Sequence, residues 1–222
     1  MEDEQRPKPS KEQYLRFKEL EKQMEPGEWN VEWMELYDAC DWSPELIKEG
    51  EKCGLRTALG EVILPAVYDN IKLMESTIVE KGERVVVIQD DRWGVVIADG
   101  DGTWLVPAEF DYIGYPNNLT AVKKGDKWGV LNISNGEYLV PPECDMVFEN
   151  KGFIFLNGIG TFVKNGLLGI ITEDGDLTEA IFEAVDPNPA GLVKVKYDGQ
   201  WGFIDEHDSF TEDMNSAAYC FD

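Results

Sequence analysis

The sequence has a single histidine, and this scarcity limits the chemistry open to the chain. Acid–base catalysis near neutral pH most often uses histidine, and His207 lies in the acidic stretch Asp205-Glu206-His207-Asp208, where a solvated side chain is the simpler interpretation. The sequence also lacks a Gly-x-Ser-x-Gly elbow, a P-loop, a dinucleotide-binding fingerprint and an HExxH motif. We therefore expect no enzymatic activity and no cofactor.

Cysteine is also sparse, with four residues that lie far apart and form no Cys-x-x-Cys pair. This spacing argues against a zinc ribbon or a redox motif. Cys53 and Cys144 occupy apolar positions of a repeat described below, so we expect both to be small buried hydrophobic residues.

Basic residues are few: 20 lysines and arginines stand against 44 acidic residues, for a net charge of −24. Nucleic acids and anionic membranes require clustered bases, and the only local cluster is Lys123, Lys124 and Lys127, so we expect neither as a partner. The acidic excess is spread along the chain, which favours a solvated surface. The alternative is electrostatic steering of a basic partner protein.

Long apolar runs are missing. No stretch approaches the eighteen residues that a membrane span needs, and the first residues contain no apolar segment typical of a signal peptide. We expect a cytoplasmic protein.

The dominant feature that is present is a repeated dipeptide. Its glycines stand 40, 35, 40 and 33 residues apart, a period at which each copy is one supersecondary unit that buries its apolar face by stacking on its neighbours. The copies are Cys53-Gly54, Trp93-Gly94, Trp128-Gly129, Leu168-Gly169 and Trp201-Gly202.

The copy around Trp128 predicts a meander of antiparallel strands. A strand at 121–123 turns at Gly125-Asp126 into a strand at 128–133, and Asn135-Gly136 then leads into a strand at 138–140 that Pro141 ends. Both faces of the middle strand are apolar, which indicates burial between successive repeats. We expect the tryptophan to supply apolar area, and Gly129 to let a neighbouring backbone or ring approach closely.

The second half of each unit repeats as well. In most copies a proline is followed, three residues later, by an aromatic residue or a cysteine, and the next residue is an acid. We expect the aromatic side chain to hold the returning segment on the core. The segments are Pro65–Asp69, Pro107–Asp111, Pro141–Asp145 and Glu179–Glu183.

The first fifty residues have a different, helical pattern. Apolar spacing and capping residues predict helices at 10–24 and 28–39 and a third from Ser43 to about Gly50. We expect a mainly β array of about four antiparallel meander repeats of 33–40 residues at 51–210. A helical cap at 1–50 precedes the array and an acidic tail at 211–222 follows it. An open stack is preferred, and propeller-like closure stays open.

These units resemble the WG-repeat (KWG) family, whose copies read approximately as Lys-Trp-Gly, an aliphatic strand, a glycine turn, then proline, an aromatic residue and aspartate. The resemblance covers residues 51–205, and the first and fourth copies depart from it at Cys53, Leu168 and Glu179. It implies an all-β bacterial repeat protein without established catalysis.

We therefore expect a non-enzymatic scaffold that binds an unidentified protein, basic in one alternative, through its least regular loops at 69–83, 111–120 and 145–160. Phe148, Phe153 and Phe155 make the last loop the preferred binding site. An aromatic patch of Trp29, Trp33 and Trp42 is a second possibility.

Three other functions remain as alternatives. The acidity fits an inhibitor or immunity-type protein that binds a basic enzyme or mimics nucleic acid. Because acidic residues are abundant, a hydrolase with a pair of carboxylates is a further candidate. The acidic turns at Asp99 and Asp174 offer oxygen ligands for calcium, although neither continues into an EF-hand.

Overall fold

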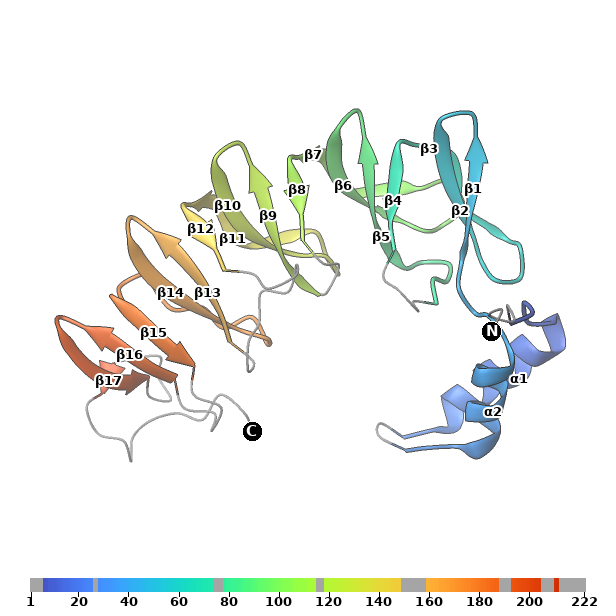
Figure 1. The fold of residues 1–222 in the computed structure, drawn as a ribbon, viewed down its shortest axis with the longest axis horizontal. Helices are drawn as coiled ribbons and strands as arrows, with labels where there is room; N and C mark the ends of the chain where they lie inside the picture. Colours follow the sequence, from blue (N-terminus) through green and yellow to red (C-terminus); the bar gives the residue numbers. More distant parts are fainter. Residues whose placement is uncertain are drawn as a thin grey trace, which may run out of the picture. The chain divides into compact units, whose positions relative to one another are not determined.

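The computed structural model describes residues 6–25, 28–73, 78–114, 118–148, 159–187, 193–204 and 210–211. Its first elements are helices α1 (Lys11–Gln23) and α2 (Val31–Ala39), close to the predicted ranges (Figure 1). The Ser10 hydroxyl accepts the N–H of Gln13, whose side chain accepts the N–H of Ser10 in return. This capping box sets the start of α1.

The helical region has its own aromatic core. Phe17 stacks on Trp42 and on Trp33, with ring centroids 4.3 Å and 5.0 Å apart. The predicted aromatic patch is therefore wrong for Trp33 and Trp42, because both rings pack inside this core, while Trp29 is exposed. The core extends to Ile78, so the helices pack against the segment that precedes the second long hairpin.

The predicted third helix is wrong, because this segment is strand β1 (Glu45–Glu49), paired with β2 (Lys52–Arg56). Gly50 has a φ of +63° and forms the tight turn between the two strands. The sequence indicated a helix because Ser-Pro is typical of a helix start and glycine of a helix end. The β region thus begins six residues before the boundary expected at 51.

Five antiparallel sheets follow, each a meander in which strands adjacent in sequence are adjacent in space (Figure 1). The first contains β1, β2 and β3 (Val62–Tyr68), and the second contains β4 (Asn70–Lys72), β5 (Arg84–Gln89), β6 (Arg92–Ile97) and β7 (Thr103–Phe110). The third contains β8 (Tyr112–Ile113), β9 (Leu119–Lys124), β10 (Lys127–Asn132) and β11 (Glu137–Cys144). The fourth contains β12 (Met146–Val147), β13 (Ile159–Lys164) and β14 (Leu167–Thr172). The fifth contains β15 (Ala184–Pro187), β16 (Val193–Tyr197), β17 (Gln200–Ile204) and β18 (Phe210–Thr211).

This architecture confirms the predicted mainly β array with a small helical region at its N-terminus. The last Trp-Gly dipeptide lies in β17 of a fifth sheet, one sheet more than the predicted four repeats. The chain divides into two compact units, Met1–Asp90 with Val96–Trp104 and Asp91–Val95 with Leu105–Asp222, and the division passes through β6 and β7.

The segments predicted as irregular loops are partly strand. Each begins with a short strand, β4, β8 or β12, that opens the next sheet directly after the acid of the repeat. The chain therefore passes from one sheet to the next through a single residue, as at Asp111 between β7 and β8.

The cores lie between successive sheets. Leu119 and Val130 of the third sheet share one buried cluster with Phe162 and Ile171 of the fourth. A second cluster joins the fourth sheet to Val195 and others of the fifth. A single sheet could not bury these faces alone, as expected of a stacked repeat.

The repeat glycine makes room for a bulge of the neighbouring strand. Trp128 pairs with Cys144 and Val130 with Val140, so residues 141–143 of β11 all pass opposite Gly129. A Cβ at Gly129 would lie 2.6 Å from the carbonyl oxygen of Val140. Pro141 was predicted to end the strand, but β11 continues to Cys144, because residues in a bulge need not donate ladder hydrogen bonds.

The repeat acid links successive hairpins. In Asp145 one carboxylate oxygen accepts from Lys127 Nζ at 2.6 Å and the other accepts from the backbone N–H of Asn165 at 2.9 Å. Asp69 joins Lys52 to the N–H of Asp90 in the same way. Asp69 and Asp145 therefore each bind a lysine side chain of their own hairpin and a backbone N–H in the turn of the next hairpin. Asp111 makes the corresponding contacts with Arg92 and the N–H of Gly125. Both contacts of Glu183, with Lys196 and with the N–H of Gly199, lie in the following hairpin.

We expect acid to weaken these links. The neighbouring lysine, and then backbone N–H donors, lower the pKa of Asp69, Asp145 and Glu183. Their contribution to stability is therefore complete above the unfolded-state pKa of about 4 and is lost as pH falls through the lower native pKa. Because the carboxylates are exposed, each contribution is small. In thermal unfolding followed from about pH 6 to 3, the melting temperature of Asp145→Asn should fall less than that of the parent. An equal fall in both proteins would contradict this role.

Candidate functional site

The fourth repeat departs from the others where its return strand should be. β7 and β11 each extend for eight residues, whereas the edge of β14 that does not pair with β13 is met only by isolated bridges from Leu168 to Phe182 and from Ile171 to Leu177. The sequence signalled this departure, because Glu179 stands where the other repeats have proline.

A side chain completes the hydrogen bonding along this edge of β14. The Thr178 hydroxyl accepts the N–H of Ile170 at 2.9 Å and donates to the carbonyl of Glu179 at 3.2 Å. Thr178 is 8% exposed, so its hydroxyl replaces a ladder carbonyl inside the core. Sequence reasoning missed this residue, since a threonine between an acidic turn and an apolar segment carries no distinctive signal.

Thr178→Val should lower the free energy of unfolding by about 1–3 kcal/mol, because it leaves the buried N–H of Ile170 without an acceptor. Thr178→Ser keeps the hydroxyl and should lose only the smaller contribution of one methyl group, about 1 kcal/mol. Urea unfolding of the three proteins measures both effects. Equal losses in the two variants would show that the hydroxyl has no structural role.

Phe162 fills space that the missing bulge leaves. It pairs with Gly169, and a Cβ on that glycine would lie 2.2 Å from its ring. The residue opposite the repeat glycine is Val122 in the third sheet and Val195 in the fifth. The aromatic ring in the fourth repeat therefore replaces a smaller aliphatic side chain.

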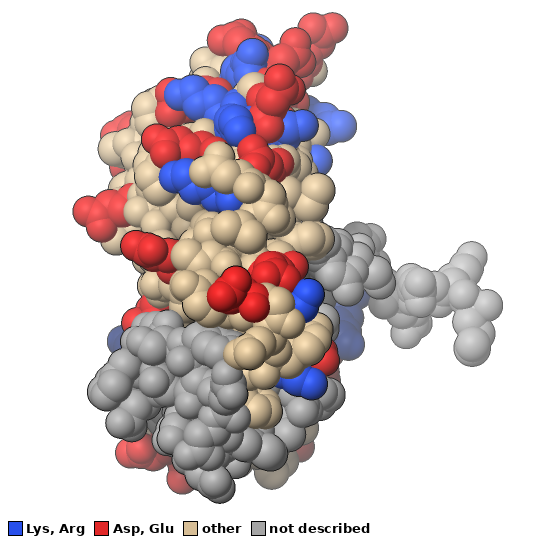
Figure 2. All heavy atoms as spheres, turned by 90° about the vertical axis from the view of Figure 1, so that its left-hand side faces the viewer, with Lys and Arg blue, Asp and Glu red and all other residues tan. Residues whose placement is uncertain are grey.

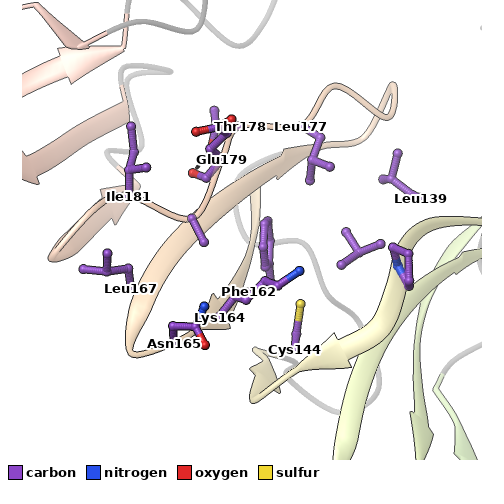
Figure 3. Close-up of a pocket in the computed structure, with 13 residues that line it drawn as sticks. Leu139, Cys144, Phe162, Lys164, Asn165, Leu167, Leu177, Thr178, Glu179 and Ile181 are labelled. Carbon is purple, nitrogen blue, oxygen red and sulfur yellow. Dashed lines mark hydrogen bonds between the residues drawn. The ribbon is translucent and has the colours of Figure 1, made fainter.

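A cleft of about 450 Å³ opens beside this ring, between β11 and residues 177–181. In Figure 3, Phe162 and Cys144 lie in its middle, with Leu139 and Leu177 on one side and Leu167 and Ile181 on the other. Its remaining lining residues are Val140, Pro141, Lys164, Asn165, Thr178, Glu179 and Ala180.

The cleft is mostly apolar, with one base and one acid on its wall. Lys164 Nζ donates to Glu143 at 3.2 Å, whereas no residue in the described part of the chain forms an ion pair with Glu179. Burial raises the pKa of the Cys144 thiol, which is 1% exposed and stays uncharged. Size and polarity suit an apolar ligand group with a few polar contacts.

The tryptophans and glycines of the repeated dipeptide differ in how deeply they are buried. Trp93 and Trp128 are half-buried and both contact the ring of Tyr112, with ring centroids 5.5 Å and 5.8 Å from it. Trp201 is 47% exposed beneath Lys194. The buried members are Gly94, Gly129, Gly169 and Gly202, so close packing falls on the glycines more than on the tryptophans.

Of the predicted binding residues, Phe148 directly follows β12 and is 47% exposed, and it does not line the cleft. Phe153 and Phe155 lie outside the described residues. Cys53 and Cys144 are buried, as predicted.

The acidic turn at Asp99 has a structural role. One oxygen of Asp99 accepts the N–H groups of Asp101, Gly102 and Thr103, at 2.8–3.3 Å. The Thr103 hydroxyl and these backbone donors lower the pKa of Asp99 to about 2. Among the described residues, no group of three or more His, Cys, Asp or Glu is placed to hold a metal ion.

A second hollow, of about 430 Å³, has a polar wall that includes Glu137, Glu173 and Asp174. The Asn135 side chain donates to Glu137 at 2.8 Å. Within the described part of the chain, no helix is long and apolar enough to cross a membrane.

Residues 97–128, from the end of β6 into β10, match the family model of the WG containing repeat. This match supports the predicted resemblance to the WG-repeat family. Outside this match, the copies are related by the repeated glycine at the centre of each hairpin and by the acid that follows most return segments.

Two solved structures are similar to this chain. Hsv2 of Kluyveromyces lactis has a TM-score of 0.31 and 12% identity over 72% of this chain and 55% of that one. Hsv2 with a complete loop 6CD has the same TM-score and identity over 78% and 58%. The chain thus spans little more than half the length of these structures. No curated protein matches it.

Proposed function

We propose that this protein is a non-enzymatic scaffold that binds another protein through the cleft between β11 and residues 177–181. One observation carries the proposal. The regular hairpin pattern, which serves packing in the other repeats, is replaced in the fourth repeat by a partly apolar cleft of about 450 Å³. Departures from a repeat are where binding surfaces are commonly placed.

The distribution of charge supports a scaffold over an inhibitor that docks through one acidic face. On the face drawn in Figure 2, basic side chains lie among the acidic ones. The ion pairs between neighbouring strands, such as Lys164 with Glu143 and Lys124 with Glu109, belong to this mixed pattern. Recognition through the apolar cleft fits such a surface better than recognition by charge alone.

Affinity capture from a native lysate with Leu177→Lys tests the proposal. Leu177 is 41% exposed on the cleft wall, so a lysine there should be tolerated in the fold while its charge opposes burial of an apolar partner group. We expect the captured partner to fall by about tenfold, the loss typical of a central contact. Because the contact is apolar, the parent should retain its partner at high salt.

Leu59→Lys is the matched control, because Leu59 is 40% exposed, lies in the first repeat and does not line the cleft. Both variants should have the melting temperature of the parent within a few degrees, about the effect of a surface change. A partner captured equally by both variants would reject the cleft as the binding site.

A further inference from the structure

Aromatic pairs close the outer side of two junctions between successive sheets. Tyr68, at the end of β3, meets Trp104 of β7 edge to face, with ring centroids 6.0 Å apart and an interplanar angle of 78°. Phe110, at the end of β7, meets Tyr138 of β11 at 6.2 Å and 69°. In each pair the buried ring, Tyr68 or Phe110, is the aromatic residue that precedes the acid of one repeat, and we call it the anchor. The exposed ring, Trp104 or Tyr138, belongs to the next repeat and is called the outer residue.

The following junction has neither ring. The anchor position is occupied by Cys144. Its exposed fraction of 1% is similar to the 2% of Tyr68 and the 0% of Phe110. The outer residue is Leu177, because it pairs with Ile171 two residues after the repeat glycine, just as Tyr138 pairs with Leu131. Leu177 is 41% exposed, close to the 40% of Tyr138 and the 39% of Trp104.

Cys144 and Leu177 both line the cleft. A cysteine and a leucine therefore lie where the preceding junctions have two aromatic rings. The cleft lies in the volume that the rings fill in those junctions. The surrounding residues are the ones that a ring would contact: Leu139 on one wall and the Phe162 ring in the middle (Figure 3). Ring pairs in edge-to-face geometry add stability beyond their buried area.

We propose that the cleft binds an aromatic side chain of a partner peptide, with a basic residue of the peptide next to it. This inference rests on the proposed function and names the chemistry of the partner. The aromatic ring would complete the junction that Cys144 and Leu177 leave open, and the base would lie against Glu179.

Charge complementarity supports the basic neighbour. Glu179 is the carboxylate on the cleft wall and has no ion-pair partner among the described residues, while the lysine of the wall is already bound by Glu143. The whole chain has a net charge of −24, which favours approach of a cationic peptide.

Titration of the full chain with two probes, N-acetyl-tryptophanamide and N-acetyl-leucinamide, tests the aromatic preference. Methyl NMR signals of Leu139 and Leu177 should shift saturably, and the tryptophan probe should bind about two- to tenfold more tightly, the value of an aromatic contact. The methyl groups of Leu59 are the internal control and should not move. Equal binding of the two probes, or shifts that do not saturate, would overturn the proposal.

Two variants locate the site. Leu177→Trp places a ring at the position that Trp104 holds in its own repeat, and it should abolish the saturable shift of Leu139, whereas Leu59→Trp should not. Acetyl-Trp-Arg-amide should bind about two- to fivefold more tightly than acetyl-Trp-Glu-amide at low salt. Glu179→Gln should remove most of this difference. An unchanged preference in that variant would overturn the role of Glu179.

The two proposals fail in distinguishable ways. If Leu177→Lys loses a captured protein but the tryptophan probe does not bind, the scaffold function stands and the aromatic preference is wrong. If the probe binds saturably but capture is the same for Leu177→Lys and Leu59→Lys, the ring site stands and the proposed function is wrong.

Discussion

Replacing Gly129 by alanine is expected to lower the free energy of unfolding by about 3 kcal/mol, the upper range for overpacking a core. The new Cβ would lie 2.6 Å from the carbonyl oxygen of Val140 and 2.8 Å from the nitrogen of Pro142. Both atoms belong to the backbone of the bulge, so no side-chain rotation relieves the contact. Urea unfolding compares the variant with the parent, and a loss below about 1 kcal/mol would show that the bulge adjusts.

Gly169→Ala is the matched comparison, because its new Cβ would meet a side chain instead of a backbone. The nearest atoms belong to the ring of Phe162, at 2.2 Å. Phe162→Val puts the residue of the third and fifth sheets at this position and should relieve the contact. A double-mutant cycle between the two substitutions should show a favourable coupling of about 1–3 kcal/mol. The same cycle between Gly129→Ala and Val122→Ala should show little coupling, because the clashing atoms there are backbone.

The fold was predictable where its physical cause is local. The Gly125-Asp126 turn and the alternation around Trp128 predicted a hairpin, and β9 and β10 pair as expected. The prediction was wrong at β1, because a glycine that ends a helix and one that turns a hairpin look alike without knowledge of the pairing strand. It also missed β4, β8 and β12, whose two or three residues are strands only because a neighbouring hairpin supplies the hydrogen bonds.

The candidate site was predictable only in part. The sequence shows that Cys144 and Glu179 stand where other copies have an aromatic residue and a proline. It could not indicate the cleft, which depends on the register that sets Leu177 opposite Ile171 across an isolated bridge. The emphasis on Phe148 followed from composition, and composition does not reveal which residues share a cavity.

Phe182→Ala is expected to lower the free energy of unfolding by about 3–5 kcal/mol, the cost of removing a buried aromatic side chain. Phe182 is fully buried in the cluster that joins the fourth and fifth sheets and meets Tyr197 edge to face at 6.5 Å. Its neighbour Ile181 is 36% exposed, so Ile181→Ala is a matched control that should cost about 1 kcal/mol or less.

The loss should be local because each repeat is stabilised mainly by the interface with its neighbours. In Phe182→Ala, amide hydrogen exchange should accelerate in β16 and β17, whose core residue Val195 belongs to the weakened cluster. Exchange in β9 and β10 should change far less, because their residues Ala121 and Val130 belong to a separate cluster. Uniform acceleration across both regions would instead mean that the sheets unfold as one cooperative unit, and the stacked-repeat account of stability would then be wrong.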